Sequence, residues 1–435
     1  MRKVALKEVS ELITKGTTPS SVGCEYVKEG INFIKSESIS DSKYLNSSIY
    51  EHIDEETDRK LKRSRIKEND LLFSIAGAYL GKIAIVRAND VPANTNQAVG
   101  IVRLKIDKVN VEYVYYYFSQ PHINAYINKL SSQSSQPNLN LDLLGKLEFD
   151  CKSLNTQQKI ASILSALDAK IELNNRINAE LEAMAKTLYD YWFVQFDFPD
   201  AQGRPYKSSG GRMVWNKEIK QEVPAGWKVK KFSEWIDSDK SGDWGNDTPQ
   251  GNYVKKVICI RGTDINGLNG TDILKPPVRY ILEKNTHKLL SSHDLIIEIS
   301  GGSPTQSTGR LAFITDNTLE RFKAPLICSN FCKAISLKDS KMLYNFAYYW
   351  NRIYDNGVLF GYEGKTSGIK NLLFDSFVNS YWTVMPEESV AYKFYAFMEK
   401  VQAKKELALA ESQHLSSLRD WLLPMLMNGQ VRVGE

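Results

Sequence analysis

A duplicated pattern constrains the fold of this chain more than any other feature of its sequence. Residues 66–77 and residues 290–301 both contain an aspartate, an apolar run and a closing glycine at the same offsets, so that Asp70 and Asp294 are 224 positions apart. Each segment predicts a turn, a buried strand and a glycine loop. A second apolar strand is predicted after each loop, at Gly81–Val86 and at Gly309–Ile314.

The order of matching blocks continues along both halves. Four further pairs of segments correspond: Phe33–Ile39 with Cys259–Ile265, Asn94–Gln97 with Cys328–Phe331, Tyr113–Phe118 with Leu343–Trp350, and Ser131–Leu139 with Gly364–Leu372. One such match arises easily by chance, but five in the same order do not. The sequence therefore predicts two copies of one domain that mixes helices and strands.

A long helix is predicted at the end of each copy. Residues 155–193 contain neither proline nor glycine, and their inward positions recur at alternating steps of four and three. This heptad seam predicts packing against another helix, and it comprises Ile160, Leu164, Leu167, Ile171, Asn174, Asn178, Leu181, Ala185, Leu188 and Trp192. The second helix is predicted from about Glu387 to Leu423, with stop signals at Pro424 and Gly429. Its less regular seam includes Phe394, Met398, Val401, Leu415 and Leu422.

We expect these two helices to pack on each other and to run antiparallel, because the halves that carry them are similar. The alternative is that each helix packs only on its own domain. Asn174 and Asn178 occupy the middle of the seam. Burial of these amides would lower stability but disfavour incorrect registers, whereas the other interpretation leaves both amides solvated.

The fold class expected is α+β, with two similar domains, a pseudo-two-fold internal repeat and a coiled coil of two long antiparallel helices. The predicted boundaries are a first domain at 1–150, a central helix at 151–195, a connector at 196–224, a second domain at 225–384 and a C-terminal helix at 385–427. A chain of 435 residues is long enough for two or three domains of typical size.

Composition sets only broad limits. The net charge of +5 and the pI near 8.6 permit a nucleic-acid partner without demanding one. No apolar run reaches the ~18 residues of a membrane span, and the N-terminus does not resemble a signal peptide, so a cytoplasmic location is expected. The five scattered cysteines are expected to be reduced thiols, mostly in the core.

Motifs of catalysis and metal binding are incomplete. Lys275-Pro276-Pro277-Val278 lacks the polar first residue and the aromatic fourth residue of the pocket with which adenine methyltransferases hold a flipped base. Gly364-Lys365-Thr366 ends like a phosphate loop, but Leu359 stands where the first glycine belongs. The five histidines form no metal-binding spacing. We therefore expect no enzyme activity, no metal site and no cofactor in this chain.

The central region carries a family resemblance. The predicted helix begins with Asn155-Thr156-Gln157-Gln158-Lys159-Ile160-Ala161. It is followed by a segment rich in aromatic residues at Leu188–Pro199, and the second domain is preceded by Glu222-Val223-Pro224-Ala225-Gly226-Trp227. This order resembles the specificity subunit of type I restriction–modification systems, and the resemblance covers essentially the whole chain.

The resemblance implies that the two domains are target-recognition domains, each reading one half of a split, asymmetric DNA site. It also implies two copies of a modification (methyltransferase) subunit and further restriction (nuclease-translocase) subunits as partners. S-adenosylmethionine and ATP with magnesium would belong to those partners.

Candidate DNA-contacting residues are polar side chains in or beside the predicted loops. Cations and amides can bond base edges, and glycine loops let the backbone approach phosphate. In the first domain we select Lys35, Tyr79, Lys82, Asn96, Gln133 and Gln136, and in the second domain Arg261, Gln306, Arg310, Asn330, Lys365 and Thr366. For each of them the alternative is a solvated loop or a capped turn.

Two other functions stay open at this point. A duplicated protein-interaction adaptor would use its helices to bind partners and would not read DNA. An enzyme with an unfamiliar site would show methyl transfer or nuclease activity on its own.

Overall fold

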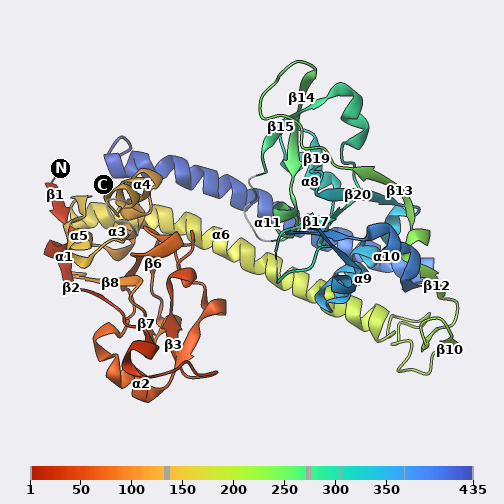
Figure 1. Cartoon of the computed structure of the whole chain (residues 1–435), viewed down its shortest axis with the longest axis horizontal. Coiled ribbons are helices and arrows are strands. Elements are labelled where there is room, and N and C mark those ends of the chain that lie inside the picture. Colours follow the sequence, from red (N-terminus) through yellow and green to blue (C-terminus); the bar gives the residue numbers. More distant parts are fainter. Residues whose placement is uncertain are drawn as a thin grey trace. The chain divides into compact units, whose positions relative to one another are not determined.

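The computed structural model describes residues 2–131, 138–270, 274, 276–303, 305–366 and 368–433. The chain divides into two compact units, of which unit 1 comprises Met1–Ile171 with His414–Glu435 and unit 2 comprises Glu172–Gln413. Each unit contains one copy of the repeated domain together with part of both long helices (Figure 1). The two units are described separately.

Unit 1 contains nine strands and five short helices within its described residues, besides its parts of the long helices. In chain order they are β1 (Arg2–Ala5), α1 (Leu6–Val9), β2 (Ser10–Lys15), β3 (Ile31–Ile34), β4 (Glu51–Ile53), α2 (Glu55–Lys60), β5 (Leu71–Ser74), β6 (Ile83–Ile85), β7 (Ala93–Thr95), β8 (Val99–Leu104), α3 (Val111–Phe118), α4 (Pro121–Ser131), α5 (Leu141–Lys146) and β9 (Glu148–Cys151).

Two sheets organise unit 1. One is antiparallel with the order β2-β8-β5-β6, and the other has the order β4-β3-β7, in which β3 and β7 run parallel. β1 pairs separately with β9. Strand β5 is buried on both faces because α3 covers one face of its sheet and the second sheet covers the other, so its residues form an uninterrupted apolar run rather than an alternating one.

Unit 2 has the same kind of content. Its elements are β10 (Met213–Asn216), β11 (Gln221–Pro224), β12 (Lys228–Lys231), β13 (Ile236–Ser241), β14 (Tyr253–Ile260), α7 (Ile265–Leu268), β15 (Val278–Leu282), β16 (Leu295–Glu298), β17 (Ser300–Gly301), β18 (Leu311–Phe313), α8 (Asp316–Arg321), β19 (Leu326–Cys328), β20 (Cys332–Leu337), α9 (Leu343–Asp355), β21 (Glu363–Thr366), β22 (Ile369–Leu372), α10 (Phe374–Ser380) and β23 (Trp382–Met385).

The sheets of unit 2 repeat the topology of unit 1. The order β13-β20-β16-β18 corresponds to β2-β8-β5-β6, and β15-β14-β19 corresponds to β4-β3-β7 with the same parallel pair. The aromatic helix α9 corresponds to α3. The predicted duplication is therefore confirmed at the level of strand order and direction.

The two long helices are α6 (Leu154–Tyr189) and α11 (Glu388–Asn428). In unit 1, Leu164 of α6 shares a core with Leu423 and Leu426 near the end of α11. In unit 2, Asn174 contacts Ser412 and Asn178 contacts Lys405, so the partners on α11 descend in number as those on α6 rise. The predicted antiparallel pairing is confirmed, and all ten predicted seam residues, nine on α6 and Trp192 in the π-helical turn after it, are buried or half-buried.

The two helix ends differ from the prediction. Helix α11 does not stop before Pro424 but continues through it to Asn428. A proline inside a helix has no N–H for the carbonyl four residues earlier, but the buried side chains of Leu423, Leu426 and Met427 anchor the last turn in the core of unit 1. Helix α6 passes into a single π-helical turn at Asp190–Val194.

The described cysteines are all free thiols. Cys259, Cys328 and Cys332 are buried in the second domain, and burial raises the pKa of the Cys259 and Cys328 thiols to about 12. Cys24 and Cys151 are half-exposed. No helix among the described residues is long and apolar enough to cross a membrane.

Candidate nucleic-acid interface

The repeated aspartate fixes the same turn in both domains. Asp70 accepts a hydrogen bond from the backbone N–H of Lys67 at 2.8 Å, and Asp294 accepts one from Ser291 at 2.8 Å. Each carboxylate also pairs with a cation, Arg103 at 2.7 Å in unit 1 and Lys240 at 2.8 Å in unit 2. The strand and glycine loop that follow therefore start from equivalent positions.

Four of the six candidates chosen in the second domain line one cavity of about 800 Å³: Arg261, Gln306, Arg310 and Asn330. Trp244 and Phe331 add partly exposed aromatic side chains to the same wall. The sequence-based selection thus identified residues from three separate segments that the fold gathers at one concave surface.

Arg261 is held at the rim of this cavity by a carboxylate. Its Nε lies 2.8 Å from Oδ2 of Asp264 and its Nη2 lies 2.9 Å from Oδ1, so the pair is bidentate. The Arg261 side chain is 40% exposed, whereas that of Asp264 is only 5% exposed. These hydrogen bonds raise the pKa of Arg261 and fix the plane of its guanidinium.

Arg310 lies deeper, where Glu298 holds it. Arg310 Nε is 2.9 Å from Oε2 of Glu298 and Nη2 is 2.6 Å from Oε1, with side-chain exposures of 16% and 6%. A Cβ added to Gly262 would lie 2.8 Å from Oε1 of Glu298, so glycine at this position makes room for the carboxylate. The hydrogen bonds to Glu298 raise the pKa of Arg310. Both residues of this largely buried pair line the cavity.

The other second-domain candidates lie on exposed loops or on β21. Gln306 is exposed, and its backbone carbonyl accepts a hydrogen bond from Lys370 Nζ at 3.2 Å. Asn330 is exposed in the turn between β19 and β20. Lys365 and Thr366 belong to β21, which pairs with β22, but their side chains lie outside what the structure describes.

In the first domain, both chosen cations pair with carboxylates and also lie over tyrosine rings. Lys35 Nζ is 3.1 Å from Oε1 of Glu51 and 4.5 Å from the ring centre of Tyr26. Lys82 Nζ is 3.2 Å from Oδ1 of Asp41 and 5.4 Å from the ring centre of Tyr79. Gln133 and Gln136 lie outside the described residues.

The correspondence that matched Asn96 with Asn330 is wrong by one residue. In the parallel pairs, Ile34 is opposite Thr95 and the equivalent Ile260 is opposite Cys328, so Thr95 rather than Asn94 corresponds to Cys328. The antiparallel sheets agree, because Ser74 pairs with Val99 where Glu298 pairs with Cys332.

Gln97 is therefore the counterpart of Asn330, and sequence analysis missed it. Gln97 is exposed, whereas the side chain of Asn96 caps its own turn by accepting a hydrogen bond from Ala98 N at 3.1 Å. Only strand register, which a short sequence match does not define, distinguishes these two neighbours.

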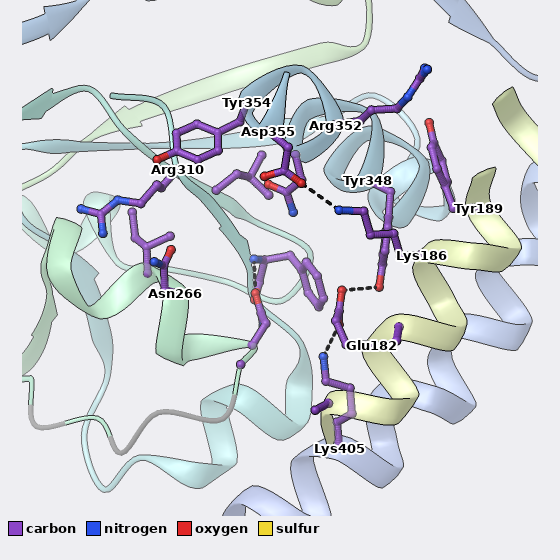
Figure 2. A pocket seen from close by; sticks show the side chains of 18 of the residues that line it. Glu182, Lys186, Tyr189, Asn266, Arg310, Tyr348, Arg352, Tyr354, Asp355 and Lys405 are labelled. Carbon is purple, nitrogen blue, oxygen red and sulfur yellow. Dashed lines mark hydrogen bonds and ion pairs between the residues drawn. The ribbon is translucent and has the colours of Figure 1, made fainter. Parts of the chain in front are cut away.

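A second cavity of about 630 Å³ in unit 2 lies against α6 (Figure 2). Glu182 on α6 accepts a hydrogen bond from Tyr348 OH at 2.9 Å and pairs with Lys405 of α11, and Lys186 lies 2.8 Å from Asp355. These contacts join α6 to α9 and to α11, so this side of the cavity consists of charges that are already paired. Among the residues that the structure describes, no group of three or more His, Cys, Asp or Glu side chains could hold a metal ion.

Comparisons with known proteins relate this arrangement to one family. Residues 1–183 match the family model of the type I restriction modification DNA specificity domain. The chain is 26% identical to the MjaIX type I restriction enzyme specificity subunit of Methanocaldococcus jannaschii, over 99% of this chain and 93% of that protein. It is 30% identical to the HindI specificity subunit of Haemophilus influenzae, over 31% of this chain and 30% of that protein.

A solved structure shares the fold. The S subunit of a type I restriction–modification system from M. genitalium aligns over 98% of this chain and 95% of its own, with a TM-score of 0.55 and 15% sequence identity. The expected fold class, two mixed domains with long helices, is thereby confirmed.

Proposed function

We propose that this chain, which is similar to type I restriction–modification DNA specificity subunits, is such a subunit and that each of its two domains reads one half of a bipartite, asymmetric DNA site. The domains are those predicted at 1–150 and 225–384. The family relationship favours this function over that of a duplicated adaptor that does not read DNA.

The observation that carries the proposal is one fold that appears twice with different side chains at equivalent positions. Lys35 corresponds to Arg261, Lys82 to Arg310 and Gln97 to Asn330. Identical domains would read identical half-sites, whereas these differences support two different half-sites. Side chains of these types make the usual contacts to base edges.

The chain itself is proposed to be non-catalytic. Type I specificity subunits work with modification and restriction subunits, and we assign methyl transfer to two copies of the former and cleavage to the latter. S-adenosylmethionine and ATP with magnesium would bind those partners, because this sequence contains neither the flipped-base pocket motif nor a complete phosphate loop.

A domain exchange tests the proposal. The chain is expressed with its methyltransferase partner, and the methylated motif is mapped by methylation-sensitive sequencing. Residues 1–150 are then replaced by the corresponding domain of another family member. One half of the methylated motif should change while the other half and the overall level of methylation persist.

Two results would contradict independent reading. If both halves of the motif change, the domains do not act separately, and if neither changes, residues 1–150 do not read DNA. Binding of the wild-type complex to random duplex, measured from low to high salt, provides the control for non-specific affinity. The purified chain without its partner should also bind random duplex in a salt-dependent way, whereas an adaptor that does not contact DNA would not bind it.

A further inference from the structure

The parallel strand pair brings the same three positions together in each domain. In unit 2, β14 and β19 run parallel with Ile260 opposite Cys328, and Ser329 N donates a hydrogen bond to the carbonyl of Ile260 at 2.8 Å. Arg261 directly follows one strand, and Asn330 and Phe331 follow the other. Because the carboxyl ends of parallel strands lie at the same edge of a sheet, these residues are neighbours, and all three line the cavity of about 800 Å³.

The geometry of Arg261 is suited to a directional contact. Asp264 holds the Nε and Nη2 atoms, which leaves the orientation of the guanidinium plane fixed before any ligand arrives. The Arg261 side chain is still 40% exposed on the cavity. An arginine held in this way loses little side-chain entropy when it binds a planar partner with two acceptors.

Asn330 and Phe331 are both exposed, which is ordinary for an amide but less so for a large apolar side chain. Phe331 is 47% exposed, and it is preceded by an exposed Asn330 in a turn held by the hydrogen bond from Cys332 N to Ser329 O at 2.9 Å. The turn therefore presents both side chains from a fixed backbone. Trp244, which is 38% exposed, lines the same cavity, so Phe331 belongs to a partly exposed aromatic wall rather than standing alone, and such a wall suggests a partner surface.

The first domain has the same arrangement with different residues. Lys35 follows β3, and the corrected register places Gln97 and Ala98 where Asn330 and Phe331 lie in the second domain. Glu51 pairs with Lys35 through a single contact at 3.1 Å, whereas Asp264 holds Arg261 through two. Each of the three positions is thus occupied in both domains by the same chemical class: a carboxylate-held cation, an amide and an apolar side chain.

The geometry points to a three-position base-reading site at the carboxyl ends of the parallel strands: Arg261, Asn330 and Phe331 in the second domain, and Lys35, Gln97 and Ala98 in the first. In the major groove, arginine or lysine bonds O6 and N7 of guanine, and asparagine or glutamine bonds N6 and N7 of adenine. Phenylalanine or alanine contacts the methyl group of thymine. This inference rests on the proposed function and identifies its specificity-determining residues.

It follows that the second half-site contains a guanine, an adenine and a thymine methyl group within the few base pairs that one site can span. The test uses the full chain in complex with its methyltransferase partner and the motif mapped for that complex. Binding is measured to duplexes that carry each single base-pair change in the second half-site. Wild type, Arg261→Lys, Asn330→Ala and Phe331→Ser are compared, with Lys323→Ala, an exposed cation outside the cavity, as the matched control.

Arg261→Lys should weaken binding to the intact motif by roughly 10-fold and reduce discrimination at one G·C pair without abolishing it, because lysine can also bond guanine but lacks the planar, bidentate guanidinium. Asn330→Ala should weaken binding by roughly 10- to 100-fold and abolish discrimination at one A·T pair. Neither variant should alter affinity for random duplex or for changes in the first half-site. Arg261→Lys retains a cation beside Asp264, and Asn330 lies on an exposed turn, so both variants should keep the melting temperature of the wild type.

Phe331 has a test of its own. Replacing thymine by deoxyuracil in the second half-site removes only the methyl group. The substitution should weaken binding of the wild-type complex several-fold and leave Phe331→Ser, which lacks the apolar side chain, unaffected.

Three results would overturn the inference while leaving the proposed function intact: unchanged discrimination in all three variants, an equal loss of affinity on every duplex, or a second half-site without a guanine. Failure of the wild-type complex to discriminate any sequence would instead refute the proposed function itself.

Discussion

Gly16 and Gly242 show how closely the two domains share their packing at the residue scale. A Cβ added to Gly16 would lie 1.8 Å from the carbonyl oxygen of Thr95 and 2.6 Å from that of Asn96. One added to Gly242 would meet the equivalent pair, 2.6 Å from the carbonyl oxygen of Cys328 and 1.9 Å from that of Ser329. Neither glycine has a positive φ, so the requirement is for space and not for backbone freedom. In both domains this contact brings the end of an edge strand against the turn that carries the proposed base-reading amide.

Gly242→Ala should destabilise unit 2, because the contacted atoms belong to backbone and the added methyl group has no room. Overpacking of this kind typically costs about 1–3 kcal/mol. Thermal and denaturant unfolding should show the loss, and DNA discrimination at the second half-site should weaken with it. Gly361→Ala is the control, since a Cβ there would meet no atom within 4 Å. Equal stability of the two variants would contradict the packing argument.

Sequence analysis predicted the cations of the candidate site better than their partners. Arg261, Arg310 and Lys35 were selected as cations in or beside the predicted loops, but Glu298, Asp264 and Glu51 were not selected. The reason is physical: the bidentate pair of Arg310 and Glu298 depends on how two strands and a glycine loop approach each other. A match between blocks defines equivalence and does not define which side chains point toward one another.

At the element scale, the heptad pattern predicted the inward face of α6 because a helical period places every seam position on one side. The same pattern did not distinguish buried from solvated asparagines. The structure buries both, with Asn174 2% exposed and Asn178 1% exposed. The end of α11 was misplaced because a proline signal was given more weight than the apolar residues on both sides of Pro424.

The two buried asparagines should respond oppositely to replacement by leucine. Asn174 donates hydrogen bonds to Oε2 of Glu411 at 2.8 Å and to Oγ of Ser412 at 3.3 Å. Asn178 donates only a long hydrogen bond, 3.3 Å to the carbonyl of Lys405, and its Oδ1 has no hydrogen-bond partner among the described residues. The first amide is thus well satisfied and the second is not.

Asn178→Leu should raise the free energy of unfolding by about 1 kcal/mol, because it removes a buried acceptor that is not satisfied, whereas Asn174→Leu should lower it by a similar or larger amount. Chemical denaturation of the full chain measures both, and each variant is the control for the other. Two losses of equal size would show that Asn178 makes a polar contact that matters as much as that of Asn174.

At the scale of the whole molecule, the repeat was the feature that sequence could predict, since repeated order does not depend on atomic detail. Each unit combines one domain with segments of both helices, so neither helix belongs to a single domain. A fold built in this way from two similar halves suggests that one half could replace the other. Helix α6 supplies the seam for such an exchange, because its inward face is complete without residues from the second domain.

A chain that ends at Gly210 should therefore dimerise through α6 and replace the whole subunit. An antiparallel pair centred on Arg176 aligns five residue pairs: Ile160 with Trp192, Leu164 with Leu188, Leu167 with Ala185, Ile171 with Leu181, and Asn174 with Asn178. Other registers would place an asparagine against an aliphatic residue, which costs roughly 1–3 kcal/mol for each unsatisfied group. Two identical readers related by a two-fold axis see an inverted repeat.

With its methyltransferase partner, the shortened chain should methylate a palindrome built from the first half-site. Sedimentation should show a dimer, and Leu181→Lys in the same chain should give a monomer without methylation. A monomeric parent, or a methylated motif that stays asymmetric, would refute this interpretation of the duplication.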